Sequence, residues 1–188
     1  MRTEDDADET LMLRYQDGDA DAFAALYARH KGALYRYLLR QCGQPALAEE
    51  LFQDVWLKLI AARTGYTVQA RFTTYLYRLA HNRLIDHYRA SSRGLPLSYA
   101  EDCPEWAEVP APAEMQPEAQ DDRRRQAERL LELLAELPEA QREAVLLKEE
   151  AGLSLEEIAQ ATGTGRETVK SRLRYAMARL RQGLRGAR

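Results

Sequence analysis

Two short segments of the pattern S/T-x-x-E lie ten residues apart in the C-terminal part of the sequence. The first runs from Ser154 to Glu157 and the second from Thr164 to Glu167. In such a capping box the hydroxyl accepts a hydrogen bond from the third helical N–H, and the glutamate accepts one from the N–H of the cap residue. A helical apolar pattern follows each box. The spacing therefore predicts a short helix, a turn and a longer helix, which is the arrangement of a helix-turn-helix.

The longer of these helices combines one apolar stripe with a basic remainder. Val169, Leu173, Ala176 and Leu180 recur at the spacing of a buried helical stripe. Residues 164–188 contain eight basic side chains and one acid, in a chain whose formal net charge is -3. A solvated helix face normally mixes charges of both signs, so this composition favours contact with phosphates over a merely soluble helix. The pattern predicts a helix that reads the major groove of DNA.

Charge and proline content divide the chain into three parts. Residues 1–93 hold 13 basic and 12 acidic side chains, residues 94–122 hold none and 8, and residues 123–188 hold 14 and 10. Five of the seven prolines lie between positions 96 and 117. A segment so rich in proline and acid cannot bury enough apolar surface to offset the entropy of ordering it. We therefore expect two domains, 1–93 and 123–188, joined by a flexible acidic linker over 94–122.

The sequence pattern of the N-terminal domain predicts helices from Glu9 to Ser91. Asp19 or Asp21 can cap a long helix that ends at Gly43. A second helix follows from about 47 to 62, then a break over 64–66 and a third helix over about 71–84. No alternating strand pattern is present, so the expected fold class is all-α: two small helical domains, the first a compact bundle.

Two segments of the N-terminal domain contain charged, amide or aromatic side chains beyond those that a hydrophobic core requires. Residues 49–56 interleave acids and an amide with large apolar side chains, as a protein-docking surface does, although on composition alone an ordinary amphipathic helix is favoured. Residues 71–93 hold five arginines against one acid, interleaved with aromatic side chains. Aromatic rings stack on unpaired bases for about 1–3 kcal/mol each, which favours a single-strand binding face. Phe72 is expected to belong to the core instead.

Several function classes lack their motifs in this sequence. It contains no Gly-rich phosphate loop, no H-E-x-x-H and no G-x-S-x-G, so neither an enzyme nor a cofactor site is expected. Cys42 and Cys103 and the three histidines lack metal-ligand spacing, so no metal is expected either. No secretory signal or membrane-spanning stretch is present, which predicts a cytoplasmic protein without direct membrane insertion. A stand-alone helix-turn-helix regulator remains the alternative reading.

A known family carries this set of features in the same order. The specific segments are Ala48-Glu-Glu-Leu-Phe-Gln-Asp-Val-Trp-Leu-Lys-Leu59, Tyr75-Leu-Tyr-Arg-Leu-Ala-His-Asn-Arg-Leu-Ile-Asp-His-Tyr-Arg89, the stretch from Leu137 to Ala159, and Thr168-Val-Lys-Ser-Arg-Leu173. The chain resembles the extracytoplasmic-function class of bacterial RNA polymerase sigma factors over roughly residues 10–93 and 123–185. Tyr75 stands where the family commonly has Trp, and Tyr175 where Arg is frequent, so the promoter sequence stays open.

The resemblance implies a role for each surface. The clamp helices of the largest polymerase subunit would be bound by Glu50, Leu51, Phe52, Gln53 and Asp54. The minus-ten element, with one non-template base taken out of the stack, would be bound by Tyr66, Arg71, Tyr75, Arg78, Asn82, Arg83 and Arg89. The minus-thirty-five element would be bound by Arg166, Thr168, Lys170, Ser171, Arg172, Arg174 and Tyr175.

The resemblance also implies partners beyond promoter DNA. These are core RNA polymerase, including the flap of its second-largest subunit, and an anti-sigma factor that can hold the protein at the inner membrane. When active, the protein would be associated with the nucleoid.

Overall fold

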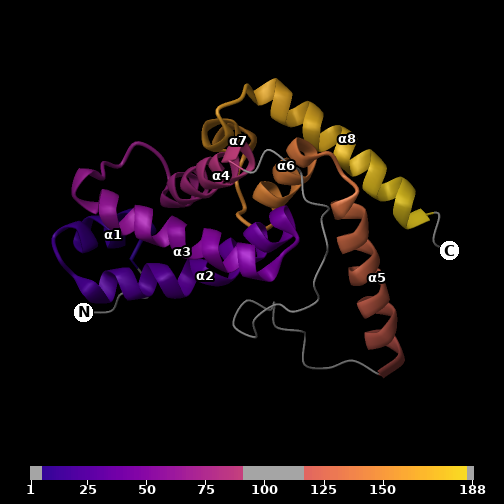
Figure 1. Cartoon of the computed structure of the whole chain (residues 1–188), viewed down its shortest axis with the longest axis horizontal. Coiled ribbons are helices and arrows are strands. Elements are labelled where there is room, and N and C mark those ends of the chain that lie inside the picture. The colour runs from indigo at the N-terminus through magenta and orange to yellow at the C-terminus, as the bar shows by residue number, and fades with distance from the viewer. Residues whose placement is uncertain (1–5, 91–116, 186–188) are drawn as a thin grey trace.

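The computed structural model describes residues 6–90 and 117–185, and every regular element in these two ranges is a helix (Figure 1). The elements in chain order are α1 (Asp8–Gln16), α2 (Ala20–Cys42), α3 (Pro45–Ala62), the short 3-10 helix η1 (Arg63–Gly65), α4 (Phe72–Ala90), α5 (Pro117–Ala135), α6 (Glu139–Glu149), α7 (Leu155–Thr162) and α8 (Arg166–Arg185). The all-α prediction is confirmed. None of the helices described is both long and apolar enough to cross a bilayer.

The ends of α2 are set by the residues that the sequence predicts. The Asp19 carboxylate accepts hydrogen bonds from the backbone N–H groups of Asp21 (3.0 Å) and Ala22 (3.2 Å). At the other end Gly43 adopts a left-handed conformation with φ 69°, which a residue without Cβ reaches without strain. Pro45 then occupies the first turn of α3, where a missing N–H is harmless.

The N-terminal core is rich in aromatic side chains. Tyr35, Tyr37, Phe72 and Tyr77 are at most 1% exposed, in a cluster with leucines from α1 to α4. Phe72 therefore lies in the core as expected, and Tyr77 joins it there. Each such ring contributes roughly 1.5–3 kcal/mol by leaving water. The single-strand face predicted on α4 therefore contains fewer accessible aromatic rings than the sequence indicates.

The helix-turn-helix is formed by α7 and α8, with one of the two predicted capping boxes. Ser154 Oγ accepts from the N–H of Glu157 (3.3 Å), and the Glu157 carboxylate accepts from the N–H of Ser154 (2.8 Å). The second box is wrong, because α8 begins at Arg166 and Gly165 takes the cap position. The Thr164 hydroxyl pairs with that of Thr162 instead (3.0 Å).

The apolar stripe predicted on α8 is confirmed. Val169, Ala176 and Leu180 are buried, and Leu173 packs against the core while remaining partly exposed. Near the end of α8, Gly183 faces Leu133 of α5 so closely that an added Cβ would overlap the leucine side chain. This close approach fixes α5 along α8.

The segment predicted as a linker, 94–122, overlaps the start of a helix. Helix α5 begins at Pro117, inside the predicted linker, while positions 94–116 lie outside the described residues. Proline at the first helical position and acids in the first turns are both helix-start signals, so the boundary could have been placed earlier.

The N-terminal and C-terminal helices pack against each other. Helix α7 lies along α4, and α6 and α5 contact α2 (Figure 1). The helix-turn-helix therefore covers part of α4, on which the single-strand binding face is predicted.

Candidate nucleic-acid interface

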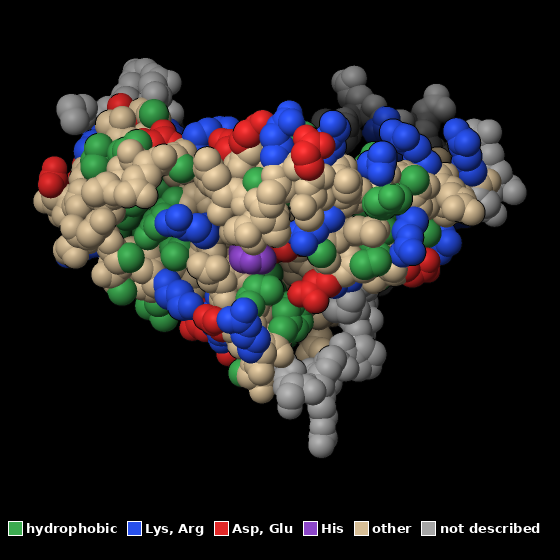
Figure 2. All heavy atoms as spheres, turned by 90° about the horizontal axis from the view of Figure 1, so that it is seen from above, with side chains coloured by type: hydrophobic (Ala, Val, Ile, Leu, Met, Phe, Trp, Pro, Cys, Tyr) green, Lys and Arg blue, Asp and Glu red, His purple; other side chains and the backbone are tan. Residues whose placement is uncertain are grey.

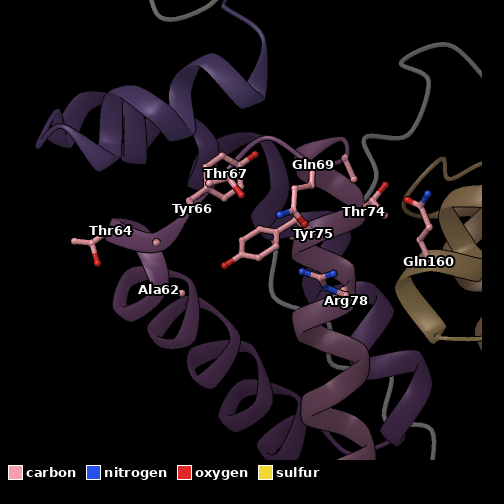
Figure 3. A pocket seen from close by; sticks show the side chains of 11 residues that line it. Ala62, Thr64, Tyr66, Thr67, Gln69, Thr74, Tyr75, Arg78 and Gln160 are labelled. Atoms are coloured by element: carbon pink, nitrogen blue, oxygen red, sulfur yellow. The ribbon is translucent and has the colours of Figure 1, made fainter.

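A pocket of about 700 Å³ opens where η1 leads into α4 (Figure 3). Tyr66 and Tyr75 form an aromatic wall, with ring centroids 5.3 Å apart in an edge-to-face arrangement. The Arg78 guanidinium lies over the Tyr75 ring, 5.7 Å from its centroid. The full lining is Ala62, Thr64, Gly65, Tyr66, Thr67, Gln69, Ala70, Thr74, Tyr75, Arg78 and Gln160.

The loop that forms this pocket is held in place by α1. The Gln16 side-chain amide donates to the backbone carbonyls of Thr64 (2.9 Å) and Tyr66 (3.3 Å). The Glu9 carboxylate accepts from the N–H of Phe72 (2.6 Å), which places a negative charge at the N-terminus of α4. Sequence reasoning missed both supports, since no local pattern links positions about fifty to sixty residues apart.

Two of the residues that line this pocket carry buried hydroxyl groups. The Tyr66 hydroxyl and the Thr74 hydroxyl are buried and have no hydrogen-bond partner among the described residues. Burial raises the pKa of Tyr66 to about 12, with the Glu9 carboxylate adding to the effect, so its hydroxyl stays protonated near neutral pH.

These features together suit a flat aromatic ligand with polar edges. The volume is in the range of small-molecule sites, the tyrosines supply ring faces, and Arg78 supplies positive charge. Gln69 and Gln160 carry amides, which both donate and accept hydrogen bonds. A nucleobase with its attached phosphate has this chemistry.

The remaining residues predicted for the minus-ten element do not line the pocket. Arg71 is exposed and pairs with Glu157 (3.4 Å), and Asn82 and Arg89 are exposed on α4. Arg83 instead turns toward α3, where its side chain, only 16% exposed, binds Asp54 (2.7 Å) and Glu50 (3.2 Å). In this structure Arg83 therefore ties α4 to α3 and is not free for a phosphate. Asp86 contacts Lys58 of α3 (3.6 Å).

The residues predicted to bind polymerase divide between the surface and the core. Glu50 and Gln53 are exposed and Asp54 is partly exposed on α3, whereas Leu51 and Phe52 are buried. The Phe52 ring packs 6.1 Å from Tyr27 and 5.9 Å from Tyr35, so neither Leu51 nor Phe52 is available to a partner in this structure.

The apolar part of the outer face of α3 lies further along the helix. Leu57 is 62% exposed and Ile60 is 36% exposed. Sequence reasoning missed both residues, although positions 53, 57 and 60 share one helix face at spacings of four and three.

Helix α8 presents its basic side chains to solvent. Arg166, Thr168, Lys170 and Arg174 are exposed, and Ser171 and Arg172 are partly exposed. Figure 2 shows many Lys and Arg side chains on the face where α8 lies. Tyr175 is 55% exposed, and the Arg174 guanidinium lies 5.0 Å from its ring centroid.

The carboxylates nearest to the basic side chains of α8 form only weak ion pairs with them. Arg166 pairs with Glu156 and with Glu167 (3.3 Å), and Lys170 pairs with Glu167 (3.6 Å), all through side chains that are more than half exposed. Exposed pairs of this kind contribute about 0–1 kcal/mol, so phosphates can replace the carboxylates. Within the described ranges no cluster of three His, Cys, Asp or Glu side chains could hold a metal ion.

Comparison with known proteins finds the same two halves. Residues 26–94 match the family model of Sigma-70 region 2, and residues 127–180 match that of Sigma-70 region 4. The RNA polymerase sigma factor CarQ of Myxococcus xanthus is 32% identical over 171 residues, which cover 91% of this chain and 94% of that protein. The ECF RNA polymerase sigma factor SigK of Mycobacterium sp. (strain KMS) is 28% identical, over 94% of this chain and 90% of SigK.

Two solved structures share the fold. CnrH, in complex with the cytosolic domain of CnrY, matches with a TM-score of 0.68 and 23% identity, over 96% of this chain and 99% of CnrH. The sigma factor RpoE from Bartonella quintana, in complex with the anti-sigma factor NepR, matches with a TM-score of 0.68 and 23% identity, over 90% of this chain and 100% of RpoE.

Proposed function

The chain belongs to the sigma-70 family of RNA polymerase sigma factors, in its extracytoplasmic-function class, and on that premise we propose how its surfaces divide the work of initiation. It is a transcription initiation factor that binds core RNA polymerase and directs it to promoters. Its action is binding and not catalysis, and it acts in the cytoplasm.

The minus-thirty-five element is read by α8 in the major groove. Arg174 and Lys170 contact base edges together with Thr168 and Ser171, because the N-terminal part of a recognition helix faces the bases. Arg166 and Arg172 bind phosphates. Tyr175 replaces a charged contact by stacking or by apolar contact with a thymine methyl group. The exposure of these side chains supports this assignment.

The minus-ten element is opened and held by the pocket beside η1. Flipping a base costs a few kcal/mol, and stacking on a tyrosine offsets about 1–3 kcal/mol of that cost. The observation that carries this proposal is the grouping of Tyr66, Tyr75 and Arg78 around a space of about 700 Å³. Arg71, Asn82 and Arg89 follow the strand outside the pocket, and Arg83 joins them only if it leaves its carboxylate partners.

Two protein partners complete the proposal. The outer face of α3, with Glu50, Gln53, Asp54 and Leu57, docks on the clamp helices of polymerase, and Leu51 and Phe52 support it from the core. The C-terminal domain contacts the flap of the second-largest subunit. Since CnrH and RpoE were solved with CnrY and the anti-sigma factor NepR, we include an anti-sigma factor as a partner, able to hold this chain at the inner membrane.

The substitution Tyr75→Ala tests the capture step. Loss of one stacking wall is expected to slow promoter opening roughly tenfold or more, given about 1–3 kcal/mol per stacked base. Permanganate footprinting of unpaired thymines measures opening, and co-purification with core polymerase measures docking, which should be unchanged. Tyr75→Phe keeps the ring and serves as the matched control. Normal opening by Tyr75→Ala would remove the pocket from the mechanism.

Adding polymerase distinguishes this proposal from the alternative, a stand-alone helix-turn-helix regulator. Gel shifts on promoter duplex with and without core polymerase, followed by run-off transcription, are expected to show specific binding and a defined start only with core. Equal specific binding without core, and no transcript with it, would favour the regulator.

A further inference from the structure

One face of α1 reaches both ends of the loop over residues 66–71, which we call the capture loop. Glu9 and Gln16 are two helical turns apart, or about 10.5 Å along the axis. The Gln16 side-chain amide donates to the backbone carbonyls of Thr64 (2.9 Å) and Tyr66 (3.3 Å), where the loop begins. The Glu9 carboxylate accepts from the backbone N–H of Phe72 (2.6 Å), where the loop ends.

The capture loop has little support of its own. Its backbone hydrogen bonds lie at the two ends, where the N–H of Tyr66 donates to Arg63 (3.2 Å) and that of Tyr75 donates to Arg71 (3.1 Å). Within the described ranges no backbone hydrogen bond joins residues 67–70 to another element, and three of these four residues are exposed. Segments of this kind open locally at low cost. The position of Tyr66 therefore depends on side chains that reach the loop from elsewhere.

The Gln16 side chain matches the two groups that it holds. A side-chain amide nitrogen carries two N–H donors, one for each of two carbonyls. Because these carbonyls belong to Thr64 and Tyr66, a single side chain fixes the backbone on both sides of Gly65. The Tyr66 ring is thereby directed toward Tyr75, with the ring centroids 5.3 Å apart (Figure 3).

Glu9 acts at the other end of the loop and on the Tyr66 ring. Its carboxylate lies at the N-terminus of α4, where unpaired N–H groups favour a negative charge. Burial and, next, the charge of Glu9 raise the pKa of Tyr66 to about 12, so the carboxylate is near the Tyr66 hydroxyl. Tyr75 and Arg78 belong to the first two turns of α4 and are placed by the same helix end.

Helix α1 is itself fixed to the rest of the N-terminal helices. Leu11 and Met12 are fully buried in the core. Asp8 pairs with Arg29 and His30 of α2, each at 2.7 Å. Helix α1 therefore connects the capture loop to a rigid part of the molecule.

The two supports come from outside the segment that the region 2 family model matches. That match begins at residue 26, whereas α1 ends at Gln16. Tyr66, Tyr75 and Arg78 lie inside the match. The pocket thus takes its aromatic lining from the matched segment and its support from the chain before it.

We propose that Gln16 and Glu9 are positioning residues for promoter opening, which hold the capture loop and the first turn of α4 so that the pocket is formed before a base enters it. This role rests on the proposed function for the base, but the two contacts do not. A loop that is already held in its binding conformation loses less freedom when the base enters, so the base is bound more tightly than by a mobile loop.

The test measures how holoenzyme binds a single-stranded oligonucleotide by fluorescence anisotropy. The oligonucleotide carries the non-template minus-ten strand of a promoter that the holoenzyme transcribes, and a matched set carries one abasic site at each position in turn. In the wild type the abasic site at the captured position should weaken binding roughly tenfold or more.

The variants Gln16→Ala and Glu9→Ala should bind the intact oligonucleotide about tenfold more weakly than the wild type does, because the hydrogen bonds that hold the loop are lost. They should bind the oligonucleotide that is abasic at the captured position as the wild type does, because the base that the pocket would hold is missing. A general loss of structure would weaken both oligonucleotides alike.

Two further variants serve as controls. In Glu9→Gln the amide oxygen can still accept from the N–H of Phe72, so this variant should bind nearly as the wild type does. Thr10→Ala changes an exposed residue of the same helix and should leave every affinity unchanged. Hydrogen exchange of the free full-length proteins should be faster over residues 64–71 in both alanine variants, with wild-type rates in α2.

The outcomes separate this role from the proposed function. If both alanine variants keep the wild-type difference between intact and abasic oligonucleotides, or weaken the two equally, Gln16 and Glu9 do not position the pocket. If no abasic site weakens the wild type, the pocket captures no base, and the proposed function and this role fail together. Faster exchange over residues 64–71 would then still show that α1 orders the loop.

Discussion

Asp8 fastens the start of α1 to α2 through two basic side chains. Its carboxylate lies 2.7 Å from Nε2 of His30 and 2.7 Å from an Arg29 guanidinium nitrogen. The hydrogen bond with His30 outweighs the cost of partial burial and lowers the pKa of Asp8 below its ordinary value of 3.8. A carboxyl with a lowered pKa stabilises the fold above its unfolded pKa and ceases to do so as pH falls through the folded value.

The substitution Asp8→Asn is therefore expected to lower stability in a pH-dependent way. At pH 7 the free energy of unfolding should fall by roughly 1–2 kcal/mol, as for hydrogen bonds to a charged group. The difference from wild type should shrink as the pH falls from the ordinary pKa through the lowered pKa of folded Asp8, below which both proteins lack the charge. Urea unfolding across this range measures it, with the exposed Asp17→Asn as control. A difference that persists unchanged in acid would show that packing and not charge is responsible.

Arg174 is the residue on which base preference should depend most. It is exposed on the N-terminal half of α8, where a recognition helix meets base edges. Arg174→Ala should lose about 1–3 kcal/mol at one promoter position and relax the preference there. Holoenzyme binding to a set of single-base promoter variants measures this, and Arg179→Ala, later on the same helix, should weaken all sequences alike. The same uniform loss for Arg174→Ala would make it a phosphate contact.

The role of a residue was predictable where a local sequence pattern determines it. It was not predictable where a tertiary contact determines it. Tyr66, Tyr75 and Arg78 could be named one by one, but only the fold brings them around one pocket. Arg83 could not be separated from the other arginines of α4, because its partners lie 29 and 33 positions away on α3. Leu51 and Phe52 lie in the core and not on the outer face of α3, which the helical spacing of 53, 57 and 60 marks.

At the scale of helices, the two S/T-x-x-E segments behave differently, which allows a matched comparison. Ser154 caps α7 with both bonds of the box, whereas the Thr164 hydroxyl pairs with Thr162 and Gly165 precedes α8. Ser154→Ala should lower the free energy of unfolding by about 1 kcal/mol, the usual worth of a cap. Thr164→Ala should cost clearly less. Thermal unfolding of the two variants side by side measures the difference, and equal losses would mean that Thr164 also serves as a cap.

Helix positions follow from the sequence more reliably than helix boundaries do. The cap at Asp19, the glycine at 43 and the stripe on α8 were all predictable, because each rests on residues within one or two turns. The start of α5 was not, since the acids and prolines before it suit both a linker and a helix N-terminus. The second capping box failed because α8 begins at Arg166, one residue later than a cap at Thr164 requires.

For the whole molecule, the packing of the two halves against each other was beyond sequence reasoning. Its contacts join residues 62 to 114 positions apart, and they bring acids of a basic segment to arginine, histidine and tyrosine side chains of a nearly neutral one. Summed charges hide such a pattern because the acids concerned are few and face inward. The helical character of both halves was predictable from the sequence pattern, but the surface between them was not.

This surface should also decide how the protein unfolds. Two domains that pack against each other unfold in a single transition only while the free energy of their interface couples them. We therefore expect calorimetry of the free wild type to show one cooperative transition. Glu143 contacts Tyr37 and His81 across this surface, Glu150 contacts Arg36, and Glu157 contacts Arg71. In E143Q/E150Q/E157Q the coupling is therefore weakened, and the transition should separate into two, one for each helical group. The triple variant E132Q/E136Q/E149Q, which removes the same charge from exposed positions, should keep a single transition. Two resolved transitions in the wild type would mean that the halves are already independent and that the contacts between them do not couple their unfolding.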